Sequence, residues 1–163
     1  MCVVHCVVVD TNVFAVAERM NDDASEECVL ACIQLLRRIE AGTRLGVDSA
    51  DEIFTEYLKA LRTAKTAGLA TKLAHLLYRQ RRDLDVCHQV DITPIDNPPG
   101  SYAEVPAALR NFDLDDQKFL AVATAEGSTP PIYQALDREW WVRQADFTAN
   151  GLTLQFLCPA DLL

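Results

Sequence analysis

Acidic residues stand at two points of the sequence where carboxylates could hold a metal ion. Asp10 directly follows the apolar run over residues 7–9, and Asp137 directly follows the run over residues 132–136. Hard divalent cations such as Mg²⁺ and Mn²⁺ select oxygen ligands, so a group of carboxylates supplies charge and geometry without any His or Cys. If the fold brings acids of this kind together, the sequence predicts a carboxylate metal site.

Two further acids fall on predicted helices. In a helix predicted over residues 114–126, Asp116 projects onto the same apolar stripe as Phe119 and Leu120, because successive residues turn by about 100°. An ionised carboxylate on an inward face is normally hydrogen-bonded, ion-paired or bound to a metal, since burying an unpaired charge is costly. In a helix predicted over residues 53–61, Glu56 lies roughly 130° from the centre of the apolar stripe, where it can reach the edge of a site.

The spacing of apolar residues predicts the elements that position these acids. Apolar runs and alternation predict strands over residues 3–9, 45–47, 86–95, 132–136 and 152–157. Helical periodicity predicts helices over residues 25–42, 53–61, 69–77, 114–126 and 140–147, and residues 97–110 are expected to form a loop. The expected caps are Ser25, Asp113, and Ser49 with Glu52 as a capping box.

Strands that alternate with helices predict an α/β protein. The expected architecture is a three-layer α/β/α sandwich around a mostly parallel central sheet, and 163 residues suit a single domain over residues 1–163. In such a fold ligands bind at the carboxyl ends of the strands. Asp10 and Asp137 are both predicted there.

The composition limits the classes of function. A net charge of −9 argues against a surface that grips nucleic acid by clustered Lys and Arg alone. An acidic protein can still act on a polyanion if bound metal ions supply local positive charge. No apolar run is long enough to span a membrane and no signal peptide is visible, so we expect a cytoplasmic protein without a membrane partner.

Six cysteines are present, and we interpret them as reduced, mostly buried thiols, because nothing in the sequence suggests secretion. A zinc site usually shows paired short spacings such as C-x-x-C. The closest pairs here, Cys2 with Cys6 and Cys28 with Cys32, lie four residues apart with apolar residues between them. Structural thiols are therefore favoured over a zinc site.

Taken in order, four segments look like the successive motifs of PIN-domain proteins, and the resemblance covers nearly the whole chain. These segments are Val7-Val8-Val9-Asp10-Thr11-Asn12-Val13, Glu56-Tyr57, Asp116-Gln117-Lys118-Phe119-Leu120-Ala121-Val122-Ala123 and Leu136-Asp137. Each is weak alone, and their order and spacing carry the likeness. The resemblance implies a PIN-like fold and an Mg²⁺- or Mn²⁺-dependent ribonuclease with Asp10, Glu56, Asp116 and Asp137 as the acidic site.

The resemblance also implies roles and partners. Asp10, Asp116 and Asp137 would be metal ligands, the last directly or through water. Glu56 would be a water-mediated ligand or a base that orients water. Thr11 and Asn12 could orient Asp10 or the phosphate, or simply form the turn after the strand, and Glu139 could join the site or start a helix. The family implies an RNA substrate. The small size is similar to that of toxin-type PIN proteins, which implies a possible homodimer and an inhibitory antitoxin partner.

Other readings stay open. A catalytically silent PIN-like module that binds RNA or protein would keep the same fold. A haloacid dehalogenase-type hydrolase would need a second Asp two residues after the first, where this chain has Asn12. Trp140 and Trp141 could stack on bases, although packing in the core is favoured, and the basic run at Arg79, Arg81 and Arg82 is expected to be a solvated helix face.

Overall fold

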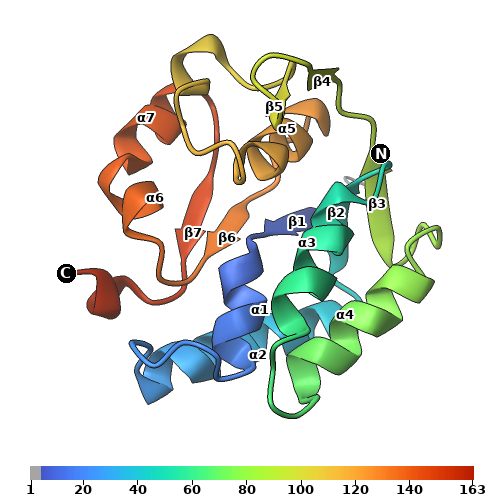
Figure 1. Cartoon of the computed structure of the whole chain (residues 1–163), viewed down its shortest axis with the longest axis vertical. Helices are drawn as coiled ribbons and strands as arrows, with labels where there is room; N and C mark the ends of the chain where they lie inside the picture. The colour runs from blue at the N-terminus through green and yellow to red at the C-terminus, as the bar shows by residue number, and fades with distance from the viewer. Residues whose placement is uncertain (1–4) are drawn as a thin grey trace.

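A parallel sheet forms the centre of the computed structural model, which describes residues 5–163 (Figure 1). Its five strands run in the order β3-β2-β1-β6-β7, and every neighbouring pair is parallel. The strands are β1 (Cys6–Val9), β2 (Arg44–Asp48), β3 (Cys87–Val90), β6 (Ile132–Gln134) and β7 (Leu154–Phe156). The α/β class and the mostly parallel central sheet are thus confirmed. Val3 and Val4, predicted to begin the first strand, lie outside the described residues.

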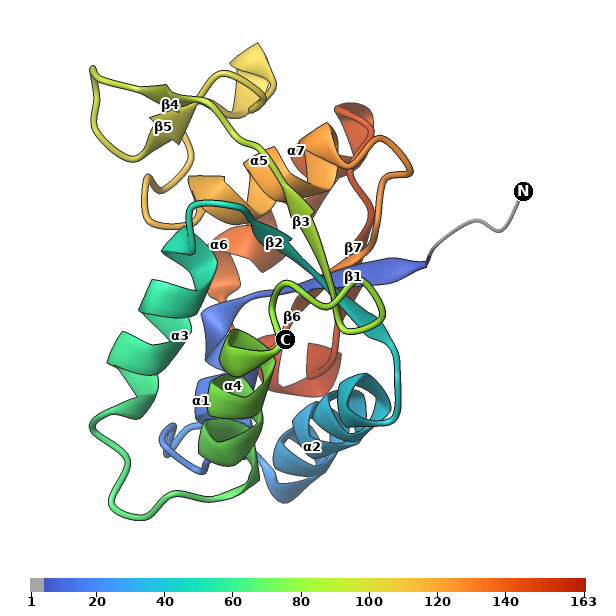
Figure 2. The ribbon, with the colours of Figure 1, turned by 90° about the vertical axis from the view of Figure 1, so that its right-hand side faces the viewer.

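Helices cover the two faces of the sheet. Figures 1 and 2 show α1 (Thr11–Ala17), α2 (Glu26–Glu40), α3 (Glu52–Leu61) and α4 (Leu69–Arg79) gathered on one side, and α5 (Gln117–Ala125) and α7 (Gln144–Ala149) on the other. This arrangement is compatible with the predicted three-layer sandwich. Each crossover between parallel strands needs such a covering helix, because both faces of the sheet are apolar.

Two regions differ from the predicted elements. The single helix predicted over residues 140–147 is two short helices, α6 (Arg138–Val142) and α7, which meet at Arg143. The extended stretch predicted over residues 86–95 divides into β3 and β4 (Pro94–Ile95), and β4 pairs antiparallel with β5 (Ser101–Tyr102) inside the predicted loop. The periodicity of such short segments is too brief to mark these breaks.

The central strand is buried along its whole length. Val8 and Val9 of β1 have no exposed surface, and Val7 is 5% exposed. β1 lies in the middle of the sheet, with β2 on one side and β6 on the other. Burying each Val side chain contributes about 1.5–3 kcal/mol, so this strand fixes the position of the residues that directly follow it.

Helix α3 is capped by a residue that the sequence did not indicate. The carboxylate of Asp48 accepts the backbone N–H groups of Glu52 at 2.8 Å and Ile53 at 2.9 Å. The predicted capping box is wrong, because the Ser49 hydroxyl donates instead to Asp91 at 2.5 Å. The strand carries Asp48 inward at its last position, whereas Ser49 is already exposed.

The other two predicted caps have different outcomes. The Ser25 hydroxyl accepts the N–H of Cys28 at 3.2 Å, as expected. Asp113 does not cap the next helix, because α5 begins at Gln117 and has Asp116 as its N-cap residue. The Asp113 carboxylate accepts the N–H of Asp115 at 3.0 Å in the preceding turn.

Replacing Asp48 by Ala is expected to lower the free energy of unfolding by about 2–3 kcal/mol, because two backbone N–H groups would lose a charged acceptor at a fully buried position. Ser49→Ala, at the neighbouring exposed position, should change it by less than about 0.5 kcal/mol. Urea unfolding of the two variants measures the difference. Equal effects would contradict the assignment of Asp48 as the cap.

The cysteines differ in part from their prediction. Cys28 and Cys158 form a disulfide with Cα atoms 5.0 Å apart, so the expectation of reduced thiols is wrong for this pair. Cys6, Cys32 and Cys87 are free and buried, as predicted, and Cys2 lies outside the described residues. The error has a physical cause, since 130 residues separate the two bonded cysteines and no local spacing shows such a pair.

No helix within residues 5–163 is both long and apolar enough to cross a membrane.

Candidate active site

The order of the strands reverses at β1, which makes this strand the topological switch point of the sheet. From β1 the chain continues to β2 on one side, whereas β6 joins on the other side much later in the sequence. Ligands of open α/β sheets bind at such a switch point, outside the carboxyl ends of the strands. Asp10 directly follows β1, and Asp137 lies three residues after the end of β6. The backbone N–H of Asp10 donates to the carbonyl of Tyr133 at 3.0 Å, so the two strand ends are level.

Asp10 is the most deeply buried of the predicted site acids, with 4% of its surface exposed. Its Oδ1 accepts the N–H of Asn12 at 2.9 Å and caps α1. Its Oδ2 is buried and has no hydrogen-bond partner within residues 5–163. Burial raises the pKa of Asp10 well above its ordinary value, and the charges of Asp116, Glu56 and Asp137 raise it further. A buried oxygen without a donor, among other acids, fits a bound cation.

Asp116 is the N-cap residue of α5, and its carboxylate accepts a hydrogen bond from one side chain. The indole N–H of Trp140 donates to its Oδ2 at 3.0 Å. The pKa of Asp116 is raised to about 7. Burial is the largest cause, the Trp140 hydrogen bond opposes the rise, and the charge of Asp137 adds to it. The prediction that Trp140 packs in the core is confirmed, because it is fully buried and stacks on Phe147 at 4.9 Å between ring centroids.

Glu56 is held by two donors from other elements. Its Oε1 accepts the Thr11 hydroxyl at 2.5 Å, and its Oε2 is ion-paired with Nζ of Lys118. Lys118 is only 12% exposed and belongs to α5, the helix that Asp116 begins. Both oxygens of Glu56 are therefore occupied, which suits a residue at the edge of a site better than a direct metal ligand.

Asp137 is partly exposed and begins α6, since its Oδ1 accepts the N–H of Glu139 at 2.9 Å. Its charge is among those that raise the pKa values of Asp10 and Asp116. Glu139 is exposed in the first turn of α6 and is not among the main causes of these shifts. The structure therefore places Asp137 with the other acids and leaves Glu139 outside them.

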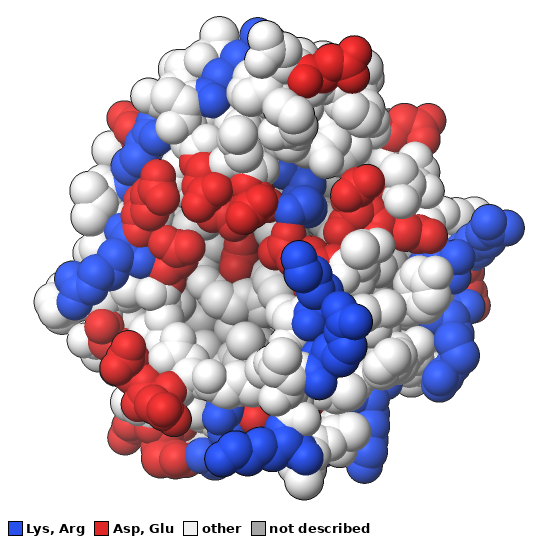
Figure 3. All heavy atoms as spheres, in the orientation of Figure 1, with Lys and Arg blue, Asp and Glu red and all other residues white. Residues whose placement is uncertain are grey.

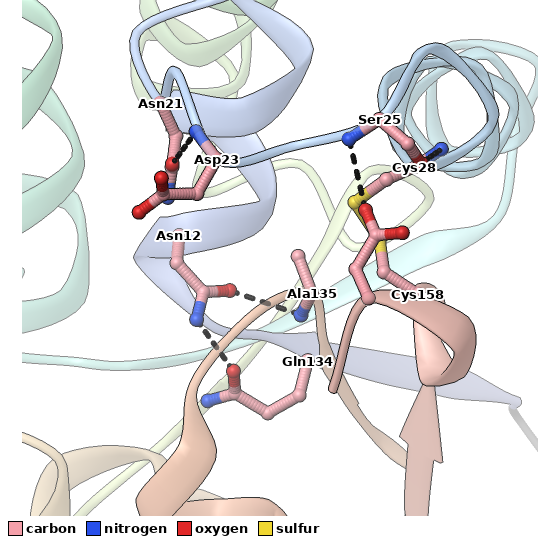
Figure 4. The surroundings of a disulfide bond; sticks show 9 residues. Asn12, Asn21, Asp23, Ser25, Cys28, Gln134, Ala135 and Cys158 are labelled. Atoms are coloured by element: carbon pink, nitrogen blue, oxygen red, sulfur yellow. Dashed lines mark hydrogen bonds between the residues drawn. A yellow bond between two sulfur atoms is a disulfide. The ribbon is translucent and has the colours of Figure 1, made fainter. Parts of the chain in front are cut away.

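Asn12 joins the ends of the two strands that flank the switch point. Its Oδ1 accepts the N–H of Ala135 at 3.1 Å, and its Nδ2 donates to Oε1 of Gln134 at 2.6 Å (Figure 4). Thr11 and Asn12 form the first turn of α1, a helix that the sequence did not predict. Thr11 is thus bonded to Glu56, and Asn12 to the end of β6.

The sequence did not single out Lys118 or Gln134 as part of this site. Lys118 lies two residues after Asp116, at the start of the same predicted helix. This closeness to a site acid could have indicated that Lys118 belongs to the site. Gln134 is fully buried at the end of β6, and its Nε2 has no partner within the described part of the chain. A polar side chain in an apolar strand, three residues before a site acid, was the signal there.

The four acids influence one another but do not form a closed cage. Within residues 5–163, the only group of three or more His, Cys, Asp or Glu ligand atoms all within 4.8 Å of one another is Cys28, Cys32 and Cys158. Mg²⁺ commonly binds through one or two carboxylates and keeps several waters, so a looser acidic group suits it.

Two hollows adjoin the acids. One, of about 520 Å³, is lined by Asn12 and Asp137 together with Asn21, Asp23, Leu136, Arg138, Asp161 and Leu162. The other, of about 420 Å³, is lined by Thr11 and Glu56 together with Lys59, Ala60, Thr63 and Asp115. Figure 3 shows Asp and Glu side chains gathered across the middle of this face, next to a hollow. An extended ligand can therefore approach the acids along the surface.

Comparison with protein families, with curated proteins and with solved structures finds no match to this chain.

Proposed function

We propose that this chain is a divalent-metal-dependent phosphodiesterase that cleaves RNA. The observation that carries the proposal is the Oδ2 of Asp10, buried and unpaired within the described residues, at the switch point of the sheet and under the influence of three other acids. The resemblance of the four acidic segments to PIN-domain motifs supports the same function and an RNA substrate.

In this proposal Asp10 and Asp116 hold Mg²⁺ or Mn²⁺, and Asp137 takes part directly or through water. When bound, the ion supplies an activated water and stabilises negative charge on the phosphate. Trp140 keeps the carboxylate of Asp116 in place, and Asn12 keeps the ends of β1 and β6 level. Glu56, fixed by Thr11 and Lys118, orients water at the edge of the site.

The acidic surface is compatible with an RNA substrate only if cations offset it. The formal charge of the chain is −9, and the acids of the proposed site would repel the phosphate groups of RNA. A bound divalent ion removes part of this repulsion, and Lys59 and Arg138 line the two hollows beside the acids, where they could contact neighbouring phosphates. An antitoxin and a homodimer remain expectations from the resemblance alone.

Two acids two residues apart give a matched test. Asp137→Asn is expected to slow cleavage by about 10- to 100-fold, because it removes a charge from the site, while Asn still caps α6. Glu139→Gln removes a charge from an exposed position outside the acids and should leave the rate within about threefold, a change of less than about 1 kcal/mol in the barrier. Both variants and the wild type would be incubated with labelled single-stranded and hairpin RNAs in Mg²⁺, Mn²⁺ or chelator.

The alternative is a PIN-like module that binds RNA or protein without cleaving. No cleavage of any RNA with either ion, together with no Mn²⁺ binding by calorimetry, would contradict the phosphodiesterase and favour that alternative. Cleavage that persists in chelator, or that falls equally in both variants, would also contradict the acidic site proposed here.

A further inference from the structure

A second group of metal-binding side chains lies apart from the acids. Cys28 and Cys32 are one helical turn apart on the buried face of α2, and Cys158 follows β7. Their three Sγ atoms all lie within 4.8 Å of one another, and the residues are 2%, 0% and 4% exposed. Two cysteines suffice for a structural disulfide, so the third sulfur at the same place needs its own explanation.

The spacing of the three sulfurs suits a thiophilic cation. A Zn²⁺–thiolate bond is about 2.3 Å long, and tetrahedral geometry then puts two sulfurs about 3.8 Å apart. All three sulfurs lie within 4.8 Å of one another, so this geometry requires that the Cys28–Cys158 bond is open and that these two sulfurs move apart. Soft thiolate ligands select Zn²⁺ and similar ions over Mg²⁺ and Mn²⁺. This site and the acidic site would therefore not compete for the same ion.

We propose that the reduced protein binds one thiophilic cation of the Zn²⁺ class through Cys28, Cys32 and Cys158. Opening the disulfide takes two electrons and two protons, which a dithiol reductant supplies as it becomes a disulfide itself. Binding of the ion then releases the three thiol protons to solvent. The fourth coordination position is left to water or a small anion.

Such an ion would hold the same segment that the disulfide holds. The 3₁₀ turn η2 (Pro159–Leu162) directly follows Cys158, and Oδ2 of Asp161 in this turn accepts the N–H of Ser25 at 2.9 Å beside the start of α2. Asp161 and Leu162 line the hollow that also contains Asn12 and Asp137. Figure 4 shows the disulfide and Asn12 in this one region. In the reduced protein the ion keeps this wall of the hollow attached to α2.

Titration with Cd²⁺, a thiophilic substitute for Zn²⁺, tests the proposal through sulfur-to-metal charge-transfer absorption, to which carboxylates do not contribute. Fully reduced wild-type protein is expected to develop this absorption up to one equivalent, and added Zn²⁺ should displace Cd²⁺. Oxidised protein, with one thiol of the three, should show none at this site. The reduced protein should also melt at a higher temperature with Zn²⁺ than without it.

Matched cysteine variants identify the ligands. Cys32→Ala leaves the Cys28–Cys158 disulfide available, so its folding can be verified in the oxidised form, and it should weaken Cd²⁺ binding by more than about tenfold after reduction. Cys87→Ala removes an equally buried free thiol of β3 and should bind as the wild type does. No stoichiometric absorption in the reduced wild type, or equal binding by the two variants, would overturn the proposal.

Discussion

Replacing Asp10 by Asn is expected to reduce metal-dependent RNA cleavage by roughly 10³-fold. The change removes the negative charge of the most buried site acid, whose Oδ2 lacks a partner within the described residues. Metal ions contribute several kcal/mol to stabilising the charge of a phosphoryl transition state, and each 1.36 kcal/mol corresponds to a tenfold change in rate.

The fold should tolerate this substitution. Asn is as good an N-cap as Asp, so the bond from the N–H of Asn12 that begins α1 can be kept. The variant also loses a buried charge that other acids repel, so its melting temperature without metal should equal or exceed that of the wild type. Asp23→Asn, at an exposed position in the neighbouring hollow, is the control and should cleave as the wild type does.

Measurement of cleavage rates, melting temperatures and RNA binding separates the competing functions. Loss of cleavage with retained folding and RNA binding supports the phosphodiesterase. A binding module predicts that none of the proteins cleaves RNA and that both variants bind RNA as the wild type does. Loss of cleavage by the Asp23 variant to the same degree would show that the effect comes from net charge rather than from the position of Asp10.

The parts of the fold that depend on local patterns could be predicted from the sequence. The apolar run before Asp10 is long enough to indicate a buried strand, and the stripe of α2 repeats over four turns from its Ser25 cap. Asp10 and Asp137 follow from the same reasoning, since each comes soon after a buried strand and parallel strands end at one edge of the sheet. The order of the strands, which puts these two ends side by side, was not predictable from local patterns.

Contacts between distant segments account for what the sequence analysis missed. Lys118 reaches Glu56 across 62 residues, and Trp140 reaches Asp116 across 24 residues. Cys158 lies 130 residues from Cys28. Such pairs depend on how whole elements pack, and no spacing within one element shows them. The prediction of the α3 cap was wrong for a more local reason. Asp48 and Ser49 are both good capping residues, and which of them faces the helix depends on which side of β2 its side chain lies.

Without metal, the protein should become less stable as the pH rises from about 4 to about 7. The pKa of Asp116 is about 7 in the folded protein against an ordinary value of 3.8. Between these values the folded state keeps a proton that the unfolded state has released, so stability is highest at low pH and falls as Asp116 ionises. The loss from this one residue reaches up to roughly 4 kcal/mol, and the raised pKa of Asp10 acts in the same direction.

Other ionisable groups also change stability over this range, so the informative quantity is the difference between the wild type and Asp116→Asn. In chelator, the free energy of unfolding of the variant relative to that of the wild type should increase as the pH rises from 4 to 8. Urea unfolding measures this difference. Mg²⁺ or Mn²⁺ binds the ionised carboxylates and should restore the wild type at pH 8 while having little effect on the variant. A difference that is constant with pH would mean that the pKa of Asp116 is the same in the folded and unfolded protein, which would contradict this prediction.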